Sequence, residues 1–198
     1  MVTRREKEIE AMKELIINVA KDIIAKEGYD NLSIRKIAGK IEYSPSIIYH
    51  YFKDKEEIVN AVMRNGYMKI VNAVSLGVSE NLTPMEKLKR MTRNYIEEAL
   101  KMPDEFLAAQ LNQSPQALMH TSYLYIGASK EKPALMVLFK CLKDIYKDDE
   151  DEQIELKAQV IAVSTMGLIM KLIIEKNIEE EQRQKLIDYF IEKVILKI

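Results

Sequence analysis

Cysteine, histidine and glycine are scarce in this sequence of 198 residues. The single cysteine, Cys141, excludes an internal disulfide framework and suits a reducing cytoplasm. One cysteine and two scattered histidines leave no zinc-type cluster, and the six scattered glycines form no phosphate-binding loop. These absences argue against an enzyme, and we expect no catalytic residues, no metal and no cofactor.

Long hydrophobic runs are also absent. The longest, residues 160–170, ends at Lys171 and falls well short of the roughly 18–20 residues that span a bilayer. The first residues contain no uninterrupted apolar segment of the kind that secretory signals have. Hydrophobic residues make up 47% and charged residues 31%, which is a soluble globular composition. We therefore expect a cytoplasmic protein with no membrane contact.

The formal net charge is −1, so the sequence has no strong excess of positive charge that would indicate a nucleic-acid partner. Residues 1–55 contain 11 Lys and Arg against 9 Asp and Glu, and the remainder contains 19 against 22. This asymmetry is mild, so an argument for nucleic-acid binding depends on where individual side chains lie.

What the sequence does have is helical periodicity. Apolar residues recur every three or four positions along nearly the whole chain, and no segment alternates as a strand does. We therefore predict an all-α fold of eight to ten helices. The first helix should run to about Glu27 and end at Gly28 as a left-handed cap. The next three helices should begin after Ser33, at Ser44 with Pro45 in the first turn, and at Asp54.

Later helices are marked by proline and by capping side chains. Residues 83–86 combine a threonine cap, a first-turn proline and a glutamate partner. The acidic stretch 147–153 reads as a solvated break; a metal site is the weaker alternative for it. Further helices are expected to start near Pro103, Pro115 and Pro133, and two strong helices to span about 153–176 and 179–197.

The stretch SPSIIYHYFKDK, residues 44–55, places aromatic and imidazole groups on a helix too short to stand alone. Ile48 and Phe52 are four residues apart and share the inward face. Tyr49 and His50 then face outward, where their polar tips can donate to a phosphate or a base edge. A short helix of this kind, preceded by another and a tight turn, is what a helix-turn-helix needs to enter a major groove. The alternative is that the tyrosines pack between helices and His50 is a surface residue.

Residues 16–62 resemble the DNA-binding domain of the TetR family of transcriptional regulators. The resemblance rests on Ala20 in the first helix, EGYDNLSIRKIA (27–38) through the second, and SPSIIYHYFKDKEEI (44–58) through the third and into the fourth. One departure is Glu42, which stands in the inter-helix turn where the family usually has glycine. Glycine tolerates positive φ there, whereas glutamate would be strained by it.

The resemblance implies double-stranded DNA as a partner and a role for each matching residue. Tyr49, Lys55 and Ser33 match positions that contact phosphates, and Ser46, Ile47 and His50 match groove-facing positions. The full set of predicted DNA-binding residues is Ser33, Arg35, Ser44, Ser46, Ile47, Tyr49, His50 and Lys55. The chain start, Thr3, Arg4 and Arg5, fits either a flexible basic arm or an ordinary frayed end.

Arg35 matches a position that can reach a base edge. A guanidinium pairs bidentately with guanine, which is worth roughly 1–3 kcal/mol of discrimination between bases. The alternative is a weak surface ion pair with Asp30 or Glu42.

A dimer is expected, because one recognition helix reads too few base pairs, whereas two DNA-binding domains can read the two halves of a palindrome. The segment 158–174 is apolar nearly all round, so one face can meet its own core and another a second subunit. In the TetR family the last two helices usually form the dimer, although both helices could instead be interior to a monomer. The predicted interface residues are Ala162, Met166, Gly167, Met170, Ile187, Phe190, Ile191 and Val194.

The middle of the chain, about 66–146, is rich in methionine and tyrosine. Such side chains suit a ligand pocket and equally suit an ordinary helical core. The resemblance implies a small-molecule inducer here. The pocket candidates are Met91, Tyr95, Phe106, Gln110, Met119, His120, Tyr123 and Phe139.

Together these patterns and the resemblance imply a helix-turn-helix DNA-binding domain over residues 1–53 and a helical ligand-binding and dimerisation domain over 54–198. The expected function is that of a dimeric repressor, released from a palindromic operator by a small hydrophobic ligand. The alternative is a DNA-binding regulator that is constitutive or controlled by a protein partner.

Overall fold

The computed structural model describes residues 3–198. In this range the regular structure consists of eleven α-helices and two short 3-10 helices, without a strand, so the predicted all-α class is confirmed. The predicted number of eight to ten helices is one too low. The additional helix is α8 (Ala128–Glu131), whose four residues are too few to show a helical period in the sequence.

The helices form two compact units. The head unit comprises the described residues through Tyr67 together with Asp104–Thr121, and the body unit comprises Met68–Pro103 and Ser122–Ile198. This is a structural division, whereas the predicted boundary between residues 53 and 54 separates functions and stays a prediction.

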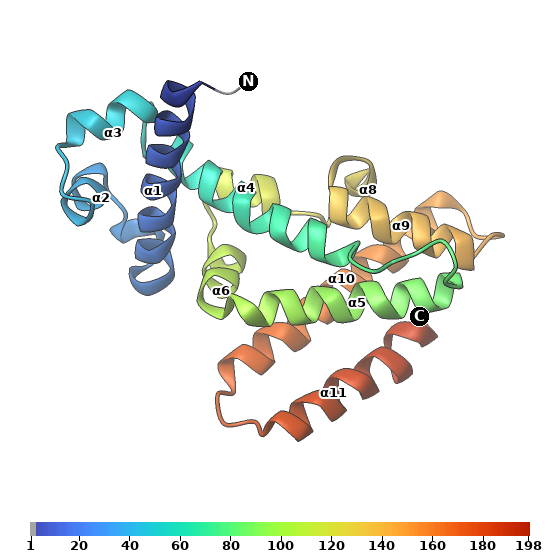
Figure 1. Cartoon of the computed structure of the whole chain (residues 1–198). Helices are drawn as coiled ribbons and strands as arrows, with labels where there is room; N and C mark the ends of the chain where they lie inside the picture. Colours follow the sequence, from blue (N-terminus) through green and yellow to red (C-terminus); the bar gives the residue numbers. More distant parts are fainter. Residues whose placement is uncertain (1–2) are drawn as a thin grey trace. The chain divides into compact units, whose positions relative to one another are not determined.

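The helices of the head unit can be followed in Figure 1, and their buried side chains form one core in which isoleucine is the most frequent residue. Ile16, Ile23, Ile37, Ile48 and Ile58 come from four helices, and each is at most 1% exposed. Burying one such side chain is worth about 1.5–3 kcal/mol, so this core fixes the short helices, which could not form alone. The helices of the head unit are α1 (Arg4–Glu27), α2 (Ile34–Lys40), α3 (Pro45–Tyr51), the first part of α4 (Lys55–Val74), α6 (Pro103–Leu111) and α7 (Pro115–Thr121).

Both ends of α1 differ in detail from their predicted form. Thr3 caps the helix in a capping box with Glu6, so Arg4 and Arg5 begin an ordered helix and do not form a flexible arm. Gly28 ends the helix with φ 83° as expected, but its ψ of 165° is extended and not left-handed helical. The chain can therefore continue directly into the 3-10 turn η1 (Tyr29–Asn31).

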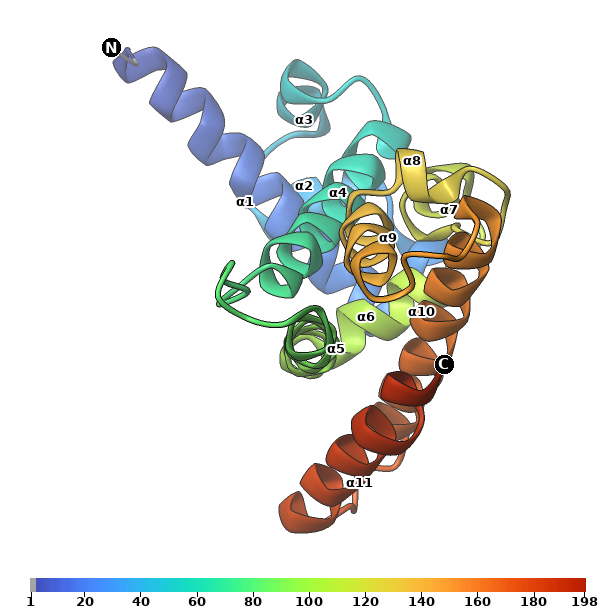
Figure 2. The same ribbon diagram turned by 90° about the vertical axis from the view of Figure 1, so that its right-hand side faces the viewer.

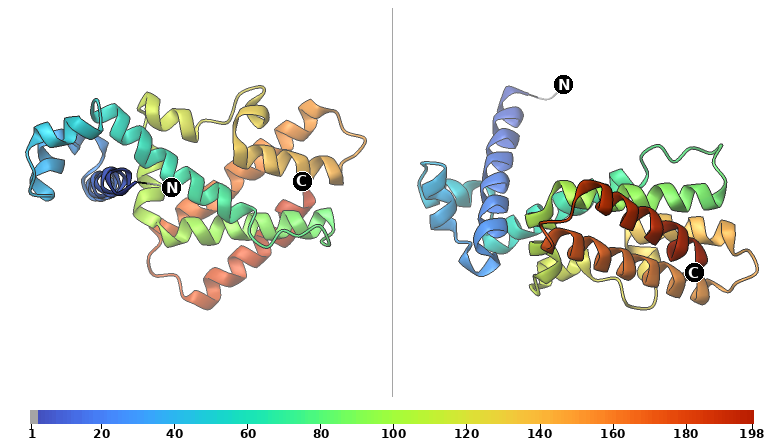
Figure 3. Two further views of the ribbon diagram at one scale, coloured as in Figure 1. Left: turned by 45° about the horizontal axis from the view of Figure 1, so that its top comes forward. Right: turned by 90° about the horizontal axis from the view of Figure 1, so that it is seen from below.

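The helices of the body unit can be followed in Figures 2 and 3, and several of them start at signals in the sequence. Thr83 and Glu86 form the predicted capping box, and α9 begins at the predicted proline, as α6 and α7 of the head unit also do. The predicted acidic break is too long, because α10 already begins at Asp151, where carboxylates are favourable next to the helix N-terminus. The body helices are α5 (Pro84–Lys101), α8, α9 (Pro133–Ile145), α10 (Asp151–Ile174) and α11 (Glu180–Lys193), followed by η2 (Ile195–Lys197).

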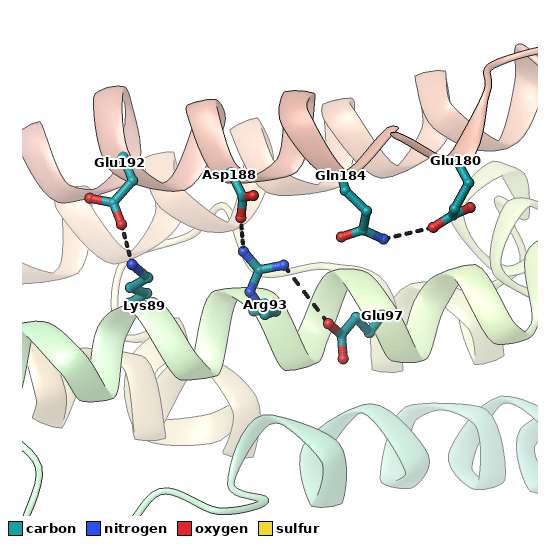
Figure 4. Close-up of polar contacts among 7 residues, drawn as sticks. All are labelled: Lys89, Arg93, Glu97, Glu180, Gln184, Asp188 and Glu192. Carbon is teal, nitrogen blue, oxygen red and sulfur yellow. Dashed lines mark hydrogen bonds and ion pairs between the residues drawn. The ribbon is translucent and has the colours of Figure 1, made fainter. Parts of the chain in front are cut away.

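Helix α11 packs against α5 (Figure 4). Lys89 pairs with Glu192, and Arg93 pairs with Asp188, from one helix to the other. Such partly exposed pairs are worth about 0–1 kcal/mol each, less than the burial of a core isoleucine. Ile187, which is 1% exposed, therefore does more to hold α11 than the ion pairs do.

Helix α10 is long and apolar enough to cross a membrane by length and composition alone. Buried helices of water-soluble proteins pass the same test, so this is weak evidence. One face of α10, with Ile154, Ala158 and Ile161, lies in the core of the body unit, and Ile169 further along the helix is also buried. A second face carries Leu156, Val160, Gly167 and Ile174, all of which are exposed.

Candidate functional site

The turn between α2 and α3 keeps a tight geometry although it contains Glu42. Glu42 has φ 59°, and it is the one non-glycine residue with positive φ in the described chain. The N–H of Tyr43 donates to the carbonyl of Ala38 at 3.0 Å, which is the long hydrogen bond of a Schellman helix end. Glutamate therefore takes the conformation that glycine normally supplies, and the turn delivers the chain directly to the start of α3.

Helix α3 has one buried and one exposed side. Ile48 is 0% and Phe52 5% exposed, so the predicted inward anchors are confirmed. Tyr49 is 56% exposed and His50 is exposed as well, with its ring edge-on to the ring of Tyr51 at 5.2 Å. Because the head core holds only the opposite side, Tyr49 and His50 are not needed for packing.

The start of α3 adds polar groups to the same surface. Ser44 is the N-cap residue, but its side chain makes no capping bond; its Oγ instead lies 2.7 Å from Oγ of Ser46. Pro45 occupies the first turn, and Ile47 is exposed. Two hydroxyls and an apolar side chain can hydrogen-bond to base edges and contact a thymine methyl group in a groove.

The start of α2 presents a second set of groups. Ser33 caps α2 by accepting from the N–H of Lys36 at 3.2 Å. Arg35 is exposed, and in the part of the chain that the structure describes it makes no ion pair, neither with Asp30 nor with Glu42. Its guanidinium is therefore available for an anion or a base edge, whereas Lys36 is occupied by Glu27.

The start of α4 holds Lys55 in place. Its Nζ donates to the carbonyl of Tyr29 at 3.1 Å and lies 4.1 Å from the centre of the Tyr29 ring. A cation over a tyrosine face is stabilised by the ring quadrupole, so the position of this charge is restricted. Sequence reasoning missed this role of Tyr29, because no local spacing relates residues 29 and 55.

Comparison with known proteins identifies this arrangement. A model of the family described as "Bacterial regulatory proteins, tetR family" matches residues 16–62, which contain α2, α3, the Glu42 turn and Lys55. Residues 16–62 belong to the TetR family of regulatory proteins. The chain shares 32% identity over 73 residues with the fatty acid metabolism regulator protein of Bacillus subtilis, covering 37% of this chain and 38% of that protein.

A second curated relative is the HTH-type transcriptional regulator BetI of Brucella anthropi, with 23% identity over 124 residues. That match covers 63% of this chain and 59% of the relative, so the chain spans less than two thirds of the length of either. The TetR family is a family of DNA-binding transcriptional regulators without enzymatic activity.

Solved structures agree over nearly the whole fold. A tetR-family regulatory protein from Rhodococcus RHA1 aligns with a TM-score of 0.70 at 17% identity, over 93% of this chain and 95% of that one. The fatty acid degradation regulator FadR from Bacillus halodurans aligns with a TM-score of 0.70 at 18% identity, over 90% and 93%. At these identities the likeness concerns the fold alone.

The predicted dimer residues have different surroundings in the body unit. Ile187 and Ile191 are almost completely buried within the unit, so they have no surface left for a second subunit. The apolar stripe of α11, with its three- and four-residue spacing, therefore faces its own core first, and the dimer interface itself stays a prediction. Gly167 and Val194 are exposed, while Ala162, Met166, Met170 and Phe190 are half-buried.

The eight predicted pocket residues are divided between the two units, and their pocket stays a prediction. Phe106, Gln110, Met119 and His120 belong to the head unit, where His120 Nε2 lies 2.7 Å from Oδ1 of Asn60. Tyr123 belongs to the body unit, where its hydroxyl donates to Sδ of Met166 at 3.8 Å and burial raises its pKa to about 12. The other body-unit candidates are Met91, Tyr95 and Phe139.

The head unit itself contains an open cavity of about 680 Å³ between the end of α1 and α6. Its lining includes Ile24, Tyr29, Leu107 and Asn112, and none of the eight pocket candidates is among the residues that line it.

Proposed function

We propose that this chain is a dimeric, sequence-specific DNA-binding transcriptional regulator. In this proposal it is a repressor that binds a palindromic operator and is released from it by a small hydrophobic ligand. The observation that supports it best is the two-sided helix α3. Its anchors Ile48 and Phe52 are buried in the head core, whereas Tyr49 and His50 face outward without a packing role.

Electrostatic groups around α3 fit the phosphates of a duplex. Arg35 lacks an acidic partner in the described structure, and Lys55 is oriented by Tyr29. Phosphate contacts position a protein on DNA, and groups that reach base edges provide the sequence preference. Tyr49 and Lys55 serve the first purpose in this proposal, and Arg35, Ser46 and His50 serve the second.

A second copy of the chain places two such heads on one operator. Leu156, Val160, Gly167 and Ile174 form an exposed apolar stripe along α10, which supports the body unit as the dimerisation unit. Two heads separated by one helical turn, roughly 34–36 Å, read two half-sites of a palindrome.

The ligand we propose is a small hydrophobic molecule, with fatty acyl compounds as the first class to test. Two relatives are named for fatty acid metabolism or degradation, and the body unit is rich in apolar side chains. Such a ligand must prefer the form that releases DNA: moving a population from 1:99 to 99:1 takes about 5.5 kcal/mol of preference.

Direct DNA binding tests the proposal. The purified chain is titrated into fluorescent fragments of the DNA upstream of its own coding sequence, at several salt concentrations and against unrelated duplex. We expect one fragment to bind with a steep salt dependence and at least about 1,000-fold preference over unrelated duplex. If neither these fragments nor a selection from random DNA gives a preferred sequence, the chain is not a sequence-specific regulator.

The ligand part is tested separately by calorimetry with acyl compounds, on free and on operator-bound chain. We expect the ligand to bind the free chain more tightly. Equal affinity for both would contradict release by the ligand and favour the alternative, a constitutive or protein-controlled regulator.

A further inference from the structure

The segment that leads into α8, residues 123–127, alternates between inward and outward side chains. Tyr123 and Tyr125 pack against the core of the body unit. Leu124 is 66% and Ile126 is 93% exposed. An isoleucine this exposed contributes almost no burial energy to its own fold, because its apolar surface stays in water.

Two side chains of α10 hold this segment, and Gln159 holds its first half. Gln159 is 9% exposed, and its Nε2 donates to the carbonyls of both Tyr123 and Tyr125 at 3.0 Å. The two residues that flank Leu124 are thus tied by their backbone to one amide group.

Glu155 holds the second half. Its carboxylate accepts hydrogen bonds from the N–H of Gly127 at 2.9 Å and from the N–H and hydroxyl of Ser129 at 2.8 and 2.7 Å. Glu155 and Gln159 are one helical turn apart on the same side of α10, so three hydrogen bonds to the segment and two to Ser129, just beyond it, fix the chain along that side. Ile126 is therefore displayed by an anchored segment.

The anchored segment borders the exposed apolar stripe of α10. Leu156 and Val160 directly follow Glu155 and Gln159 in sequence, so they lie about 100° further round the helix. Between Lys157 and Lys171 the helix carries no charged residue. Leu124 and Ile126 consequently extend this apolar surface beyond the helix itself, and the exposed Lys130 and Glu131, of opposite charge, follow a few residues later in the chain.

The occupant that fits this surface is a second copy of the chain. An apolar surface next to one exposed lysine and one exposed glutamate has no excess of positive charge for the phosphates of DNA, whereas a two-fold dimer needs a patch that can meet itself. Because the neighbouring Lys130 and Glu131 carry opposite charges, the apolar patch can meet its own copy without a net repulsion between like charges. It is also continuous with the α10 stripe on which the proposed dimer rests.

We propose that residues 123–127 form a dimerisation arm, in which Leu124 and Ile126 of each copy pack against the body unit of the other. This inference rests on the proposed dimeric function and adds to it an interface element outside the last two helices. The arm's anchors, Glu155 and Gln159, lie on the helix that forms the rest of the interface.

Sedimentation equilibrium of the full chain tests the arm, with three single variants compared with the wild type. Ile126→Asp removes the arm's most exposed contact, and Val160→Asp disrupts the α10 stripe. The matched control is Leu76→Asp, because Leu76 is 72% exposed in the same unit but lies in the connection from α4 to α5. All three positions are exposed, so the monomer should fold, which circular dichroism verifies.

We expect Ile126→Asp and Val160→Asp each to raise the dimer dissociation constant at least about tenfold and Leu76→Asp to leave it within about twofold. If Val160→Asp weakens the dimer while Ile126→Asp behaves like Leu76→Asp, the arm is refuted and the proposed function stands. A monomeric wild type refutes the dimer and the arm together, whatever its DNA binding. If that monomer binds neutral phosphatidylcholine vesicles through Ile126, the surface serves a lipid and the arm is equally refuted.

Discussion

Replacing Glu42 by glycine should stabilise the protein. Glu42 has φ 59°, and a left-handed conformation costs a residue with a side chain roughly 1–2 kcal/mol. Glycine avoids this cost but loses about 0.5–1 kcal/mol of additional chain entropy on folding. The difference predicts that Glu42→Gly raises the free energy of unfolding by about 0.5–1 kcal/mol.

Two further variants separate backbone conformation from charge. Glu42→Ala removes the carboxylate but keeps a Cβ, so its stability should stay below that of Glu42→Gly. Gly39→Ala adds a Cβ inside α2, where no atom lies within 4 Å of it, and should stabilise by up to about 1 kcal/mol. The same methyl group is thus expected to help at position 39 and to cost stability at position 42.

Urea unfolding followed by circular dichroism measures these differences, and hydrogen exchange at the Tyr43 amide reports on the turn itself. Because the Tyr43 N–H donates to Ala38, its exchange should slow in Glu42→Gly. The reasoning is refuted if Glu42→Gly is no more stable than Glu42→Ala, since glycine would then relieve no strain.

Three other predictions follow from single contacts. Arg35→Lys keeps the charge but not the planar fork, so it should cost roughly 1–3 kcal/mol of discrimination between operator and single-base variants, measured by competition binding; unchanged discrimination would remove Arg35 from base readout. Thr83→Ala should lower the unfolding free energy by about 1 kcal/mol in urea, because α5 loses its capping box, and a change near zero would show that the cap is dispensable. Burial raises the pKa of Glu155, but hydrogen bonds from Gly127 and Ser129 outweigh burial and hold the pKa below the ordinary 4.5. The stability that this carboxylate adds is therefore present above pH 4.5 and lost as pH falls through the lower folded-state pKa. The difference in unfolding free energy between wild type and Glu155→Gln, measured in urea, should accordingly become smaller as the pH falls through that range. A difference that stays constant with pH would contradict this prediction.

Local signals in the sequence were enough to predict most helix boundaries. Thr83 and Ser33 cap helices as expected, and the α3 anchors Ile48 and Phe52 are buried. These features depend on residues within a few positions of one another, where helical spacing alone decides which side chains meet.

The features that were missed depend on contacts between distant segments. Lys55 meets Tyr29 across 26 positions, and Glu155 meets Gly127 across 28, so no period in the sequence reveals either contact. For the same reason the stripe of α11 was assigned to a dimer, although Ile187 and Ile191 pack inside the body unit. An apolar stripe predicts burial but does not say which neighbour provides it.

The central claim is that the exposed side of α3 reads DNA. The most direct measurement is the affinity of Tyr49→Ala and His50→Ala for the preferred fragment of upstream DNA, with Leu76→Ala as the control. The account predicts that both α3 variants keep wild-type folding and dimerisation but lose sequence-specific binding, while the control binds as the wild type does. If both variants keep wild-type affinity and specificity, the exposed side of α3 does not read the operator and the account is wrong.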